Sequence, residues 1–134
     1  MNRYYLNTVI FAEKPASADE IVIAEAIKNL HRARGERAVE EIISFYDENA
    51  MIQSLPTKGK GTRKQYEERL KVNIKSLRST YFGDIFIRVA NENKATVSMT
   101  VCYRYVTYTM GPARLFFNME KKNNRWRITE SEWV

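Results

Sequence analysis

The chain has 134 residues, of which 44% are hydrophobic, 12% aromatic and 28% charged, and its formal net charge is +6. This length and composition support one domain with one hydrophobic core, and no stretch reaches the roughly 18 consecutive apolar residues of a membrane-spanning helix.

Cys102 is the only cysteine, which excludes an intrachain disulfide and suits a reducing compartment. We expect the cytoplasm, with the periplasm or a place in a longer protein as alternatives. One histidine and one cysteine are too few for a zinc-type site, so we expect no metal and no cofactor.

The N-terminal segment is apolar over residues 4–12 but is interrupted by Asn7 and Thr8. It is too short and too polar for a signal peptide. We therefore expect residues 1–16 to form an arm or an edge strand that packs on the domain, and the domain itself to span residues 17–134.

Two helices are predicted next. Ser17 and Glu20 have the spacing of a capping box, which marks the start of a helix, and Gly35 is placed to end it in a left-handed conformation. Its apolar face at helical spacing consists of Ile23, Ile27 and Leu30. The second helix, within residues 35–50, has an apolar stripe made of Val39, Ile42, Ile43 and Tyr46.

A short strand, a loop and a third helix follow. Residues 50–55 have the length of a strand, and residues 56–61 contain a proline and two glycines that predict a loop. Thr62 and Gln65 form a second possible capping box and predict the start of the third helix. Its buried face would consist of Tyr66, Leu70, Ile74 and Leu77.

The positive charge is concentrated on this helix and the loop before it. Residues 58–78 hold eight lysines and arginines against two glutamates, and this surplus of six equals the net charge of the whole chain. Such a surface could meet phosphates, but no recognition motif or exposed aromatic cluster accompanies it. We expect a solvated face and no nucleic acid partner. The candidate basic surface consists of Lys60, Arg63, Lys64, Lys71, Lys75 and Arg78.

From residue 80 the apolar period changes from 3.6 to 2. Four strands are predicted at residues 81–90, 94–109, 113–121 and 125–133, separated by segments rich in residues that favour turns. The long strand alternates between a buried face, with Val97, Met99, Val101, Tyr103 and Tyr105, and an outer face, with Ser98, Thr100, Cys102, Arg104 and Val106. Three helices before an antiparallel meander predict an α+β fold in which the helices cover one side of a curved sheet.

The last predicted strand ends in two acids. Because side chains two apart share a face of a strand, Glu130 and Glu132 would continue the apolar stripe of Trp126 and Ile128. The stripe then runs either into solvent or into a pocket where two carboxylates of unlike pKa could do chemistry. Glu130 is the candidate catalytic residue in the second case.

Three segments resemble the nuclear transport factor 2-like superfamily, which includes the SnoaL-like proteins and shares a cystatin-like fold. SFYDENAMI at residues 44–52 resembles the family's passage from the second helix into the first strand. KGKGTRKQYEERL at residues 58–70 is similar to its glycine-then-helix segment, and FNMEKKNNRWRI at residues 117–128 resembles its closing hairpin. The resemblance implies a sheet curled into a cone that holds a ligand between the sheet and the helices. The candidate pocket residues are Tyr46, Met99, Tyr103, Tyr105, Phe117, Trp126 and Glu130.

The resemblance does not carry the chemistry of the steroid isomerases in this superfamily. Their proton-transfer groups correspond here to Leu30, Ser54 and about Leu115, which cannot exchange protons in that way. The cyclases use acids and histidines, but His31 lies beside Arg32 late in the first helix, where a charged histidine suits the helix dipole.

We therefore expect a non-catalytic module that binds a small hydrophobic ligand or a protein partner. The family often forms dimers through the outer face of the sheet, and Val106 and Tyr108 extend that face, so we expect a homodimer. A lyase or isomerase that uses Glu130 with Tyr103 or Tyr46 is the alternative. Anion or nucleic acid binding by the basic third helix is a second alternative.

Overall fold

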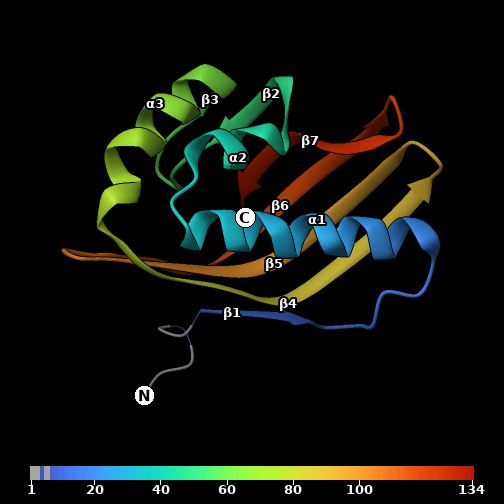
Figure 1. Cartoon of the computed structure of the whole chain (residues 1–134), viewed down its shortest axis with the longest axis horizontal. Helices are drawn as coiled ribbons and strands as arrows, with labels where there is room; N and C mark the ends of the chain where they lie inside the picture. The colour runs from blue at the N-terminus through green and yellow to red at the C-terminus, as the bar shows by residue number, and fades with distance from the viewer. Residues whose placement is uncertain (1–3, 5–6) are drawn as a thin grey trace.

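Helices cover one face of a curved seven-stranded sheet in the computed structural model, which describes Tyr4 and residues 7–134 (Figure 1). The helices are α1 (Ala18–Gly35), α2 (Val39–Ser44) and α3 (Arg63–Asn73). The strands lie in the order β1 (Thr8–Phe11), β4 (Leu77–Asn91), β5 (Lys94–Tyr105), β6 (Thr109–Lys122), β7 (Arg125–Trp133), β2 (Tyr46–Gln53) and β3 (Lys60–Thr62). Only the β1–β4 and β2–β7 pairs are parallel among these. The predicted α+β class is confirmed.

Both predicted capping boxes form. In α1 the Glu20 amide donates to Ser17 Oγ at 3.1 Å, and the Ser17 amide donates to the Glu20 carboxylate at 2.8 Å. Thr62 and Gln65 exchange the same two bonds at the start of α3. Each box provides acceptors for two backbone amides that would otherwise have no partner at the N-terminus of the helix. The start of both helices is therefore fixed by local residues.

The end of α1 differs from the prediction. Gly35 remains inside the helix, and the residue with positive φ is Arg37, at 58°. The Arg37 guanidinium donates to the carbonyl of Leu77 at 2.9 Å, a contact that ties this turn to the start of β4. The left-handed residue therefore lies two positions after Gly35, and its side chain makes a long-range contact that a glycine could not make.

Several element boundaries also differ. The strand predicted from residue 50 begins at Tyr46, because Tyr46 pairs with Ile128 of β7 and does not continue α2. α3 ends at Asn73, a 3₁₀ turn covers Ile74–Ser76, and β4 begins at Leu77, before the predicted residue 81. β3 lies in the predicted loop, and β6 begins at Thr109, before the predicted residue 113. Pairing across the sheet overrides the local pattern at each of these places.

The predicted alternation of β5 is confirmed at its centre. Val97, Met99, Val101 and Tyr103 are buried against the helices, whereas Ser98 and Thr100 on the opposite face are half-exposed. Val106 and Tyr108 do not extend this outer face, because β5 ends at Tyr105 and both residues lie in the turn before β6.

The N-terminal segment forms an edge strand over the residues that the structure describes. β1 lies parallel to β4, and the Thr80 amide donates to Asn7 Oδ1 at 3.0 Å. The rest of the predicted arm includes residues 1–3, 5 and 6, which lie outside the described residues. No helix in the described part of the chain is long and apolar enough to cross a membrane.

His31 joins α1 to β4 and is not a solvated helix-end residue. It is half-buried, its ring meets Phe82 edge to face at 5.1 Å, and its Nε2 lies 2.7 Å from the carbonyl of Thr80. Because a carbonyl only accepts, Nε2 carries the proton. Burial lowers the pKa of His31, against the opposing effect of the Thr80 bond, so the fold favours the neutral ring.

We predict that stability falls on acidification because of His31. A base with a lowered folded pKa contributes its full stability above its unfolded value, near 6.5, and loses it as the pH falls through the folded value. The free energy of unfolding, measured in urea at pH 7.5 and pH 5.0, should decrease more in the wild type than in His31→Gln. An equal decrease in both proteins would contradict this role.

Candidate functional site

The apolar stripe of α1 ends in a buried arginine. Ile23, Ile27 and Leu30 face the sheet as predicted, and Arg34 follows four residues after Leu30 on the same face of the helix. Only 4% of Arg34 is exposed, so its guanidinium lies inside the cone and not in solvent. Arg32, two residues earlier, points the other way and forms surface ion pairs with Glu36 and Glu41.

Tyrosines surround the Arg34 guanidinium. The guanidinium lies 4.3 Å from the ring centre of Tyr103, and its Nη2 donates a hydrogen bond to the hydroxyl of Tyr66. Tyr46 and Tyr105 also contribute to the raised pKa of Arg34. Burial alone would lower the pKa of Arg34, but the tyrosines raise it above its ordinary value, and the group stays charged.

Most of the donors on Arg34 have no partner. Neither Nε nor Nη1 makes a hydrogen bond among the described residues, although both atoms are buried. These two atoms carry three of the roughly five N–H donors of a guanidinium. No Asp or Glu of the described chain lies within salt-bridge distance of Arg34. A buried cation without a counter-charge is costly, and this arrangement therefore lowers the stability of the folded protein.

Three of the tyrosines near Arg34 carry no charge at neutral pH. Burial raises the pKa of Tyr46 and Tyr103 well above the ordinary range and raises that of Tyr105 to about 12. Their hydroxyls can donate or accept hydrogen bonds but cannot neutralise a guanidinium. The group of Arg34 and these tyrosines therefore has a net positive charge.

Two small cavities adjoin Arg34, with volumes of about 30 and 20 Å³. Arg34, Ser54, Tyr66 and Tyr103 line both, so the cavities are neighbours. The smaller one is also lined by Trp133, whose Nε1 is a second buried donor without a partner among the described residues. Each cavity is large enough for one or two oxygen atoms of water size.

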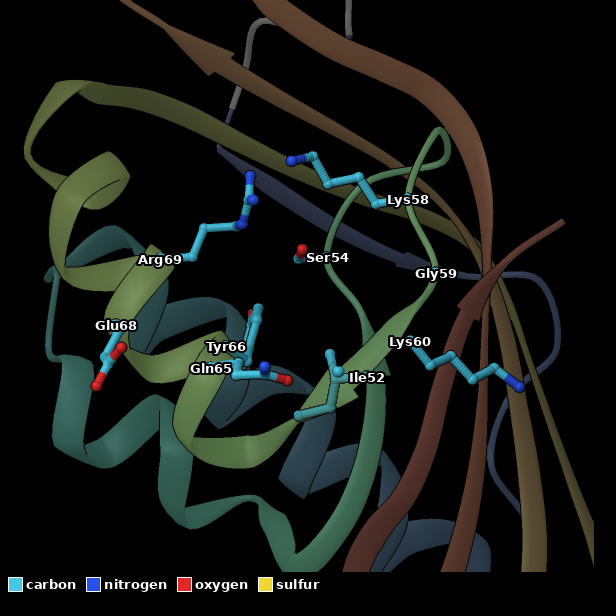
Figure 2. A pocket seen from close by; sticks show the side chains of 10 residues that line it. Ile52, Ser54, Lys58, Gly59, Lys60, Gln65, Tyr66, Glu68 and Arg69 are labelled. Atoms are coloured by element: carbon cyan, nitrogen blue, oxygen red, sulfur yellow. The ribbon is translucent and has the colours of Figure 1, made fainter.

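A larger hollow lies outside these cavities, and we call it the vestibule. It has a volume of about 530 Å³ and lies between α3 and the segment that joins β2 to β3 (Figure 2). Ser54 and Tyr66 line the vestibule and also both inner cavities, so they form the boundary between them. In Figure 2 the side chains of Lys58 and Arg69 extend over the vestibule from opposite sides, whereas Glu68 points away.

β7 contains a bulge that decides where the two acids point. Met119 of β6 pairs with Ile128, but the preceding Asn118 pairs with Glu130, so Thr129 is an extra residue in β7. An extra residue moves every later side chain to the opposite face. Ser131 and Trp133 therefore face the cone after the bulge, in place of the acids.

Glu130 lies on the outer face of the sheet, and its predicted place beside Trp126 in the cone was wrong. Its carboxylate accepts from Lys60 at 2.8 Å and from Asn118 at 2.9 Å, and Lys60 also pairs with Glu132 at 3.0 Å. The bond from Lys60 keeps the pKa of Glu130 below its ordinary value, the opposite of what a buried general acid needs.

The other predicted pocket residues fall into two groups. Tyr46, Tyr103 and Tyr105 line the inner cavities. Met99, Phe117 and Trp126 are buried in the packed core and line neither of these cavities nor the vestibule. These three side chains therefore belong to the packed core, whereas the two inner cavities adjoin Arg34.

The predicted basic residues do not form one surface. Lys60 of β3 pairs with the two acids of β7 on the outer face of the sheet. Lys71 pairs with Glu67 at 3.7 Å, and Arg78 lies on β4. Lys64 and Lys75 are exposed, and Arg63 lines a separate hollow beside Asp47 and Lys122.

Cys102 is buried, and burial raises the pKa of its thiol, which does not suit a nucleophile.

Three important residues were missed in the sequence. Arg34 had a signal, since it continues the spacing of Ile27 and Leu30, but a basic residue late in a helix also suits the helix dipole. Tyr66 was predicted only as a core residue. Trp133 had no signal, because the bulge that turns it inward depends on pairing with β6.

Comparisons with known proteins place the fold. No family model matches the chain, and no curated protein matches it. An NTF-2 like protein of unknown function from Shewanella oneidensis has 17% identity and a TM-score of 0.74 over 86% of this chain and 98% of its own. A candidate scytalone dehydratase from Novosphingobium aromaticivorans has 19% identity and a TM-score of 0.73 over 86% and 82%. A candidate calcium/calmodulin dependent protein kinase II association domain from Xanthomonas campestris has 14% identity and a TM-score of 0.73 over 99% and 96%.

The chain has the nuclear transport factor 2-like fold. The resemblance found in three sequence segments is confirmed at this level. Identities below 20% to these structures indicate a shared fold and not a shared activity.

We predict that Arg34 reduces the stability of the protein. Replacing a buried charge by an apolar side chain of similar length removes its desolvation cost, whereas the bond to Tyr66 and the contact with Tyr103 are lost. The free energy of unfolding of Arg34→Met should be higher than that of the wild type by roughly 1–3 kcal/mol. Arg32→Met, which removes surface ion pairs, should change it by less than about 1 kcal/mol. A large loss of stability in Arg34→Met would show that Arg34 serves the fold.

Proposed function

We propose that this protein is a binding module for a small molecule with a negatively charged group, which it holds in the cone without transforming it. The observation that carries the proposal is the buried Arg34 guanidinium, which has donors without partners and no carboxylate of the described chain in salt-bridge distance. A ligand with a negative group would supply both the missing acceptors and the missing charge.

The vestibule also supports the binding of a negatively charged ligand. Lys58 and Arg69 extend over it and would attract an anion, and Ser54 and Tyr66 separate it from Arg34 (Figure 2). Positive charge thus follows the path from the surface into the cone. The lining is mixed in character, because Ile52 and Gln65 also contribute, and this suits a ligand with polar groups better than the purely hydrophobic ligand expected from the sequence.

The groups inside the cone favour binding over chemistry. A general acid or base works best with a pKa near the operating pH. Among the residues that line the inner cavities, Arg34, Tyr46, Tyr103 and Tyr105 have shifted pKa values, and all four are raised far above neutrality. Glu130, the acid of the alternative lyase or isomerase, lies outside the cone because of the bulge in β7, and it is paired there with Lys60. These observations support a module that leaves its ligand unchanged.

We predict that this ligand can be found by thermal unfolding. In a library of small acids and neutral compounds at pH 7, the acids that bind should raise the melting temperature of the wild type and of Arg32→Met but not that of Arg34→Met. A ligand at 100 times its dissociation constant should stabilise the protein by about 2.7 kcal/mol. Hits that persist in Arg34→Met, or compounds that are consumed on incubation, would contradict the proposal.

We also infer a homodimer formed through the outer face of the sheet. Phe86, Ser98 and Phe116 are neighbours across β4, β5 and β6 on this face, and both aromatic rings are only half-buried. Half-exposed aromatic side chains at the centre of a sheet face favour association. This partner proposal is separate from ligand binding, since Arg34 lies on the other side of the sheet.

We predict that the dimer depends on Phe116. Sedimentation equilibrium should give twice the chain mass for the wild type and the single chain mass for Phe116→Glu, because a buried charge at an interface is costly. Val106→Glu, at an exposed position in the β5–β6 turn, should leave the mass unchanged. A monomeric wild type would contradict the inferred dimer.

A further inference from the structure

We propose that the negative group bound by Arg34 is a carboxylate, and that Trp133 is the second residue that binds it. This inference rests on the proposed function and makes it more specific. It follows from three properties of the inner cavities: their charge, their size and the position of their donors.

The charge of the site matches a single negative charge. Arg34 is the only charged side chain among the described residues that line the cavity of about 20 Å³, and Tyr46 and Tyr103 beside it are neutral at pH 7 because burial raises their pKa values. A carboxylate carries one negative charge, which one guanidinium balances. A phosphate monoester carries about −1.5 to −2 at pH 7, and its excess charge would have no partner in this cavity, because the second arginine, Arg69, lines only the cavity of about 30 Å³.

The size of the site favours the same group. The two cavities hold about 30 and 20 Å³, and each accepts one or two atoms of the size of water. A carboxylate is planar and places only two oxygens in this space, whereas a phosphate places three around a tetrahedral centre. A planar guanidinium fork also matches the two oxygens of a carboxylate directly.

The donors come from two distant parts of the chain. Arg34 at the end of α1 and Trp133 at the end of β7 line the same cavity, and each has a buried N–H without a partner among the described residues. Trp126 provides a contrast within the protein, because its Nε1 donates to Asp19 at 3.3 Å. One indole is therefore satisfied by the fold, and the other is available to a ligand.

The boundary between vestibule and cavities determines how such a ligand would lie. Ser54 and Tyr66 line both sides of this boundary, and the Tyr66 hydroxyl takes one bond from Arg34. A carboxylate passing between them would reach Arg34, and the body of the ligand would remain in the vestibule of about 530 Å³. The ligand class is therefore a small organic acid with its carboxylate at one end.

The two tryptophans provide a direct test, because the chain contains only these two indole N–H groups. In a ¹H–¹⁵N NMR spectrum of the full chain, titration with 3-phenylpropionate should shift the Trp133 indole signal until it saturates and leave the Trp126 indole signal in place. The neutral 3-phenylpropionamide and the more highly charged 2-phenylethyl phosphate, which have similar shapes, should bind at least about ten-fold more weakly.

Variants separate the parts played by the two residues. Arg34→Met should abolish the shift of the Trp133 signal, and Arg32→Met should preserve it. Trp133→Phe keeps the aromatic ring but removes the donor, and the affinity for 3-phenylpropionate measured by calorimetry should fall about ten-fold. Unchanged NMR dispersion in the backbone region shows that each variant is folded.

The outcomes distinguish this inference from the proposed function. Equal shifts of the Trp133 signal with the acid and the amide would overturn the carboxylate inference and leave a ligand-binding cone. Preference for the phosphate would assign the site to a phosphate ester and would also overturn it. No shift with any of the three probes, together with a library that gives no hit dependent on Arg34, would overturn both.

Discussion

The interior of the cone contains one energetically costly feature, the burial of a guanidinium that has no counter-charge among the described residues. Arg34 lies inside the cone with three N–H donors that have no partner among the described residues. Stability alone does not favour such a group, because an apolar side chain in the same place would avoid its desolvation. Binding sites commonly carry this kind of cost, since a group that is satisfied by the protein has nothing left to offer a ligand.

The fold holds this charge by bringing together elements that are distant in sequence. α1 carries Arg34 to the sheet, β2 contributes Tyr46, α3 contributes Tyr66, and β5 contributes Tyr103, all buried against it. These side chains help to bury the guanidinium, and the face of the Tyr103 ring, 4.3 Å away, partly stabilises its charge. The bulge in β7 then turns Trp133 inward. The site is thus built from two helices, α1 and α3, and from three strands of the sheet, β2, β5 and β7.

The sequence predicted the architecture well because its signals were local. Both capping boxes formed, the alternation along β5 held from Val97 to Tyr103, and the three segments that resembled a known family indicated the right fold. The predicted site failed at Glu130 for a reason that a single strand does not contain. One extra residue, Thr129, exchanges the two faces of β7, and only the register with β6 reveals it. Arg34 was overlooked because a late basic residue also suits a helix end.

A crystal structure of the protein soaked with 3-phenylpropionate tests the central claim most directly. We expect the carboxylate oxygens to lie within hydrogen-bond distance of the Arg34 guanidinium and of Trp133 Nε1, with the phenyl ring in the vestibule beyond Ser54. This expectation would be contradicted by an Arg34 side chain that pairs with an aspartate or glutamate of the protein itself or of a second subunit, or by a ligand bound elsewhere on the surface.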